Sequence, residues 1–74
     1  MTSARADAIF FMNMVRRGRI TPERAIEDLG MPGKLEKLVR GFAEKDAEFA
    51  ATIDRIAEHR RAAVEELRRL LMLP

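Results

Sequence analysis

The chain has 74 residues, which allows one small domain and excludes a large buried core. It contains no cysteine, so disulfides and thiolate metal sites are excluded, and association with a partner is the remaining way to stabilise so small a domain. The formal net charge is only +2 although the sequence pI is about 9.7, a balance that permits nucleic-acid binding without demanding it. Ala, Leu, Glu and Arg dominate while Trp and Tyr are missing, which predicts an all-α fold.

The first predicted helix covers residues 4–17. Ser3 is a suitable N-cap, and Gly18 suits the left-handed position that commonly follows a helix C-terminus. The stretch 8–15 is apolar on nearly all sides, which predicts that the helix is buried: as a simple core helix, in a core shared between chains, or in a partner's groove. The residues expected to contact another chain here are Phe10, Phe11 and Met14.

The same apolar stretch is too short to cross a bilayer, which takes about 20 apolar residues. A signal peptide begins with basic residues and ends in a small-residue cleavage site, whereas here Asp7 precedes the stretch and arginines follow it. We therefore expect no export signal, no membrane association and a cytoplasmic location.

The second predicted helix covers residues 22–29. Thr21 is the expected N-cap, and Pro22 takes the first helical position, where a backbone N–H has no helical partner in any case. Gly30 is expected to end the helix in a left-handed conformation, within a Schellman motif that brings the next residue against the last turn. Pro32 then prevents the helix from continuing.

From residue 34 to residue 73 the chain has no proline and a single glycine, Gly41. Apolar residues recur mostly every three or four positions, with Lys45 and Arg60 as interruptions, and this spacing is typical of one helix face. The pattern predicts one long amphipathic helix over about 34–72, with Gly41 as the expected place for a kink or a break. The whole chain would be one domain, with a helical corner over 1–33 and an oligomerising helix over 34–74.

Two short helices cannot cover the apolar face of so long a helix. Residues 42–73 alone would extend roughly 48 Å at about 1.5 Å per residue, and short connections would keep the first two helices near the N-terminal half. Exposed apolar surface of this extent usually marks an interface, so we expect a homo-oligomeric helical bundle or coiled coil, most simply a dimer. The predicted seam consists of Phe49, Ile53, Ile56, Ala63, Leu67 and Leu70.

Residues 20–35 resemble a helix-turn-helix, with a short capped helix, a Leu-Gly turn and a second helix. Pro32-Gly33 stands where such a recognition helix usually has a polar start. The layout of a basic three-helix unit followed by an oligomerising helix also resembles phage-type small terminase subunits and small phage regulators. These resemblances imply DNA binding, for which phosphate contacts supply much of the affinity. The candidate contacts are Arg16, Arg17, Arg19, Lys34, Lys37 and Arg40.

The sequence gives little support for catalysis. His59 is the only histidine, and Thr52 on the same helix lies about 10 Å away, so we expect His59 to be solvated. Glu58 and His59 are adjacent and point about 100° apart, which excludes the Glu-x-x-His pairs of di-iron bundles. We expect no catalytic residue, metal or cofactor. The leading hypothesis is a non-enzymatic adaptor or regulator, homo-oligomeric and with a protein partner; the alternative is a DNA-binding regulator or packaging factor.

Overall fold

The computed structural model describes residues 3–73, and within this range it contains four α-helices and no strand. The helices are α1 (Ala4–Arg16), α2 (Pro22–Leu29), α3 (Gly33–Ala43) and α4 (Ala47–Met72). The predicted all-α class is therefore confirmed, while the predicted domain limits at residues 1 and 74 lie outside the described range. None of these helices is long and apolar enough to cross a membrane, as far as residues 3–73 are concerned.

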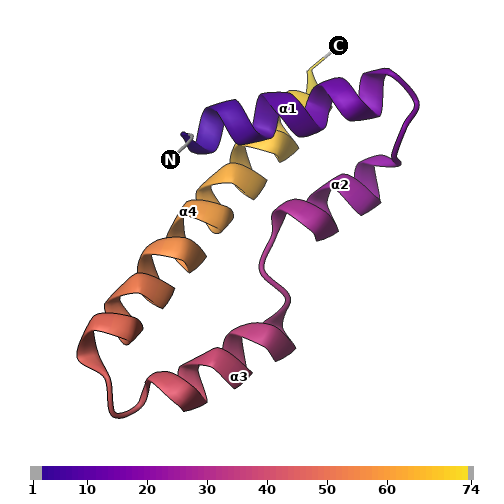
Figure 1. Ribbon diagram of the computed structural model, residues 1–74. Helices are drawn as coiled ribbons and strands as arrows, with labels where there is room; N and C mark the ends of the chain where they lie inside the picture. Colours follow the sequence, from indigo (N-terminus) through magenta and orange to yellow (C-terminus); the bar gives the residue numbers. More distant parts are fainter. Residues whose placement is uncertain (1–2, 74) are drawn as a thin grey trace.

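The long helix α4 lies along one side of the molecule, and the other three helices follow one another along it (Figure 1). The molecule is elongated, with extents of 46 × 21 × 17 Å. The first helix packs mainly against the C-terminal half of α4, α2 contacts both α1 and α4, and α3 runs beside the N-terminal half of α4 (Figure 1). The chain thus covers its longest helix with its own shorter ones.

The ends of α1 follow the predicted capping chemistry. The Ser3 hydroxyl accepts a hydrogen bond from the Ala6 N–H at 3.0 Å, which satisfies one of the free donors of the first turn. At the other end Gly18 has a φ of +72°, and the Arg19 N–H donates to the Met14 carbonyl at 3.0 Å. This is the long bond of a Schellman motif, which the sequence had placed after α2 rather than after α1.

The N-terminus of α2 is capped as predicted, because the Thr21 hydroxyl accepts a hydrogen bond from the Arg24 N–H at 3.1 Å. Its C-terminus differs from the prediction, since Gly30 is extended (φ −73°, ψ 172°) and not left-handed. Glycine is instead favoured at this position because a side chain would be crowded. A Cβ at this position would lie 3.1 Å from the Ile26 carbonyl oxygen and 3.5 Å from a methyl group of Val64.

The free carbonyls at the end of α2 are capped from another helix. The Nη1 atom of Arg60, on α4, donates to the carbonyl oxygens of Leu29 and Gly30 at 3.3 Å each. A cation at a helix C-terminus also interacts favourably with the helix dipole. The arginine that interrupts the apolar pattern therefore has a structural role in fixing α2 against α4.

The predicted long helix is broken, but not at Gly41. The helix continues through Gly41 to Ala43, and residues 44–46 form the turn between α3 and α4. Asp46 then starts α4 as its N-cap, with a side-chain oxygen that accepts from the Phe49 N–H at 3.0 Å. An aspartate at this position offers the backbone a new helix start, which a glycine alone does not. The prediction of one helix over 34–72 is therefore wrong.

This turn reverses the chain and changes which apolar residues face water. Leu67 is 0% exposed and Ile53 is 5% exposed within a single chain, and Ala63 is also fully buried. Leu70 packs against the same core. The sequence had predicted that these residues face water without a second copy, whereas the chain's own helices cover both halves of α4.

The main core lies where α1, α2 and the C-terminal half of α4 meet. Its buried members are small or branched residues: Ala8, Ala25, Leu29, Ala63 and Leu67. Phe11, Met12 and Val15 of α1 are half-buried against it. Met14 is also half-buried, but Phe10 is 62% exposed, so the chain's own helices do not cover that side of α1.

Replacing the cap of α4 is expected to destabilise the fold. In Asp46→Ala the Phe49 N–H loses its acceptor, and the loss of such a cap lowers the free energy of unfolding by about 1 kcal/mol. Glu58→Ala, at an exposed position in the middle of the same helix, is the matched control and should change stability little. Urea denaturation followed by circular dichroism compares them, and equal stability of the two variants would argue against a helix start at residue 46.

Candidate functional site

The hairpin formed by α3 and α4 is the part of the molecule with the most uncovered apolar surface. Among the described helices, α3 contacts α4 alone, so most of its circumference has no neighbour. The two edges of this hairpin differ in chemistry. One carries ion pairs, and the other carries large apolar side chains.

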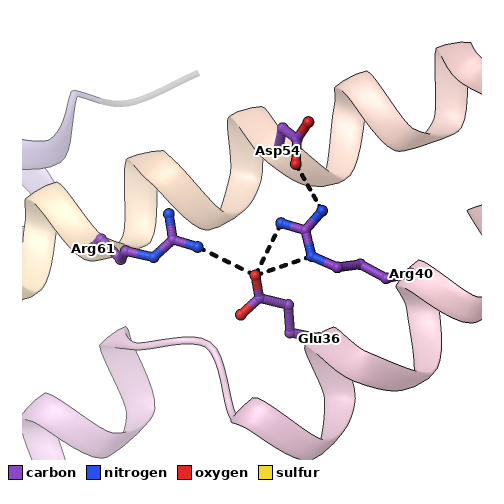
Figure 2. A network of polar contacts seen from close by, with 4 residues as sticks. All are labelled: Glu36, Arg40, Asp54 and Arg61. Atoms are coloured by element: carbon purple, nitrogen blue, oxygen red, sulfur yellow. Dashed lines mark hydrogen bonds and ion pairs between the residues drawn. The ribbon is translucent and has the colours of Figure 1, made fainter.

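The first edge, here called the polar edge, is a four-residue ion network (Figure 2). One carboxylate oxygen of Glu36 accepts from Nη2 of Arg40 at 3.0 Å and from Nη2 of Arg61 at 3.2 Å. The Nη1 atom of Arg40 donates to Asp54 at 2.7 Å, so the network joins α3 to α4 in two places. Solvent screens pairs this exposed, so their main effect is to fix how the two helices face one another.

The same contacts affect the charge of Arg40. The hydrogen bond to Asp54, followed by the one to Glu36, raises the pKa of Arg40 above its ordinary value. A raised pKa for a cation means that its stabilising contribution is present at all pH values below the ordinary pKa and is lost only as the pH rises through the raised one. The guanidinium of Arg40 therefore stays charged throughout the physiological range.

The second edge is called the apolar edge below, and its members are Leu35, Leu38, Phe42, Phe49 and Ile56. The α3 members recur at intervals of three and four, and the α4 members are seven residues apart, so each set forms a stripe along its helix. Phe42 is 73% exposed and Leu38 is 59% exposed. Phe49 and Ile56, which the sequence had placed in an interface, are partly exposed here, with 38% each.

Both stripes lie on the same side of the hairpin, opposite the ion network. In two antiparallel helices, side chains displaced in the same rotational sense from the contact line come to the same edge. On α3 the buried residue is Ala43, with Phe42 on the apolar side of it and Glu36 on the polar side. On α4 the buried residue is Ala57, with Ile56 on the apolar side of it and Arg61 on the polar side. The result is an uncovered apolar strip built from two helices.

A shallow hollow of about 400 Å³ adjoins the apolar edge on α3, lined by Lys34, Lys37, Leu38 and Gly41. Apart from its chain neighbours and the backbone of its own helix, nothing lies within 4 Å of the point where a Cβ of Gly41 would stand, so the missing side chain leaves open space. Within residues 3–73 neither lysine has an ion-pair partner. The hollow is thus apolar at its base and basic at its rim.

The predicted nucleic-acid contacts do not form one group. Arg40 belongs to the polar edge, whereas Lys34 and Lys37 line the hollow on another side of α3. Arg16 and Arg17 lie at the opposite end of α2, at the α1–α2 corner, exposed and without an ion-pair partner in the described range.

Arg19 lies at the same corner and is also exposed. The residues that resemble a helix-turn-helix include α2 and the start of α3, but these two helices make no contact in the described structure. The helix pair of a helix-turn-helix is therefore not formed here.

The sequence missed the polar contacts that hold α1 on α4. Nε2 of His59 lies 2.7 Å from a carboxylate oxygen of Asp7, and Nη1 of Arg5 donates to Glu66 at 2.7 Å. His59 is thus half-buried against α1 rather than solvated as predicted. No local pattern identifies such pairs, because the partners are 52 and 61 residues apart in the sequence.

A groove of about 460 Å³ lies between α4 and the loop after α2. Its charged lining consists of Glu36, Arg61, Glu65 and Arg68, with no histidine, serine or threonine. Glu36 and Arg61 are already engaged with each other in the polar edge. Across residues 3–73, no group of three or more His, Asp or Glu side chains is placed to hold a metal ion.

Comparison of this chain with protein-family models, with curated proteins and with solved structures finds no match in any of the three.

Proposed function

We propose that this chain is a non-enzymatic interaction protein, an adaptor or regulator, and that the apolar edge is its binding surface. The observation that carries the proposal is the contrast between the covered faces of α4 and the exposed apolar side chains of the hairpin. The chain covers both halves of α4 with its own helices, yet leaves Leu38 and Phe42 more than half exposed next to Phe49 and Ile56. Large apolar side chains gathered on one face favour association, because burying them removes apolar area from water.

The shape of this surface favours a helix as the partner. Two antiparallel helices with apolar side chains along one edge form a trough, and an amphipathic helix can lie in it with its apolar face inward. Such a helix would contact α3 where that helix has no neighbour of its own. The occupant is a helix of a second copy or of another protein.

Removing the most exposed member of the apolar edge is expected to weaken the docking of a helix. The probe is a synthetic amphipathic helical peptide of about 14 residues, roughly 21 Å long, with leucines on one face and glutamines on the other. Phe42→Ser should weaken its binding about tenfold or more, the effect of losing an aromatic anchor. Fluorescence anisotropy of the labelled peptide measures the dissociation constant.

The matched control is Phe10→Ser, which removes an equally large and similarly exposed ring from α1, a helix that makes no contact with α3. It should leave peptide binding unchanged. Equal losses in both variants, or no peptide binding to the wild-type chain, would contradict a binding surface at the apolar edge. Light scattering across a concentration series identifies the other occupant: reversible self-association that Phe42→Ser abolishes would mean that a second copy occupies the edge.

DNA binding is a second candidate function, favoured by one observation. Arg16, Arg17 and Arg19 gather at one exposed corner, and none has an ion-pair partner in the described range. If this corner contacts phosphates, the binding constant for duplex DNA falls steeply with salt, and replacing one of these arginines by glutamine lowers the slope by about 0.9. Salt-independent or absent binding would rule out this function.

A further inference from the structure

The lysines of this chain are distributed differently from its arginines. All three lysines, Lys34, Lys37 and Lys45, belong to the α3–α4 hairpin: two line the hollow beside the apolar edge, and the third lies in the turn between the helices. No carboxylate among residues 3–73 pairs with any of them. Arginines, in contrast, make the ion pairs within the fold, as Arg40 and Arg61 do on the polar edge.

Building on the function proposed above, we propose that the partner of the apolar edge is an acidic amphipathic helix of another protein. One of its apolar side chains fills the hollow at Gly41. Carboxylates along the flank of that helix pair with Lys34 and Lys37, the two cations at the rim of the hollow. The surface is thus complementary in both respects to a helix that is apolar on one face and acidic beside it.

A second copy of this chain fits the surface less well. A symmetric dimer brings the same patch of both copies together, so the patch must complement itself. The hollow next to this surface is lined by Lys34 and Lys37 and by no carboxylate. Self-pairing would bring like charges together, which disfavours a second copy and favours an acidic partner.

Gly41 gives the hollow its shape. Position 41 lies inside α3, where φ is negative and any residue can adopt the backbone conformation. An alanine there would favour the helix, so the glycine carries a conformational cost within α3. The glycine leaves open space next to Leu38, and a side chain of the partner can occupy this space.

The closing experiment compares two peptides of the length given above that differ only on their flank, one with glutamates and the other with glutamines. The wild-type chain should bind the glutamate peptide about threefold to tenfold more tightly, the effect of two exposed ion pairs. In Lys34→Gln/Lys37→Gln the two peptides should bind equally well. The preference for glutamate should also decrease as salt is added. Arg68→Gln/Arg69→Gln, which removes two charges near the end of α4, is the control and should retain the preference.

Gly41→Leu provides a second variant that is expected to fold at least as well as the wild-type chain. It should weaken both peptides about tenfold by filling the hollow, while thermal unfolding monitored by circular dichroism shows no loss of stability.

The failures of the two proposals are distinguishable. Equal binding of the glutamate and glutamine peptides to the wild-type chain, with loss in Phe42→Ser, would retain the binding surface and overturn the acidic partner. No binding of either peptide would overturn both the binding surface and the acidic partner.

Vesicles of phosphatidylserine and phosphatidylcholine in equal amounts test an anionic lipid surface as the alternative source of negative charge. Sedimentation with these vesicles that Lys34→Gln/Lys37→Gln abolishes, without any preference between the peptides, would identify a lipid surface and overturn the acidic helix.

Discussion

Leu67→Ala is expected to lower the free energy of unfolding by about 2–5 kcal/mol. The side chain is 0% exposed, and it packs in the core where α1 and α2 meet α4, so truncating it removes buried apolar area and leaves a cavity. A chain of this length has a total stability of about 4–11 kcal/mol, so the loss is a large share of it. Urea denaturation, followed by the helical circular-dichroism signal at about 222 nm, gives the change in the free energy of unfolding.

Two comparisons separate an intramolecular core from an intermolecular seam. Leu38→Ala removes the same atoms from a side chain that is mostly exposed, and it should change stability far less. The unfolding midpoint of Leu67→Ala, like that of the wild-type chain, should not depend on protein concentration, because its contacts lie within one chain. A midpoint that rises with concentration in the wild-type chain and not in Leu67→Ala would restore Leu67 to a subunit interface.

Ala63→Leu is expected to destabilise the fold by about 1–3 kcal/mol, although it adds apolar volume. Ala63 is fully buried among Ala8, Ala25 and the leucines of the same core. Helices that meet through alanines lie close together, and the extra atoms of a leucine have no room unless backbones move apart. Thermal and urea unfolding report the loss.

The neighbouring position provides the control for this substitution. Ala62 lies one residue earlier on α4 and is exposed, so Ala62→Leu adds the same atoms where there is space for them. Both changes have nearly the same effect on helix propensity, which leaves packing as the difference. If Ala63→Leu were as stable as Ala62→Leu, the close approach of the helices at Ala63 would be wrong.

The helix starts at Ser3 and Thr21 were predictable because a cap acts within three residues. Each hydroxyl accepts from a backbone N–H three positions along, so the residue type and its neighbours are sufficient to recognise the cap. The start at Asp46 uses the same chemistry, and Lys45 interrupted the apolar pattern at that point. The prediction failed there because the apolar spacing continues across the turn and Gly41 was the expected place for a break, whereas the helix start depends on the cap at Asp46.

The candidate site was only partly predictable. The sequence identified Phe49 and Ile56 as members of an apolar face, and Lys34 and Lys37 as surface cations. It did not bring these residues together, because their proximity depends on the reversal at 44–46. The apolar members contributed by α3 were consequently absent from the predicted interface.

The sequence by itself determined the all-α class, the bounds of α2 and the capping of α1, since these depend on contacts between residues close in the chain. Only the tertiary structure decided which apolar residues are covered. A helix stripe is equally apolar along its length, and whether Leu67 or Phe42 meets water depends on where the other helices lie. Likewise Arg60 interrupts the apolar stripe in the sequence, and only the packing of α2 against α4 brings two carbonyl oxygens within hydrogen-bond distance of its side chain. Periodicity specifies a face, while the path of the chain specifies what that face meets.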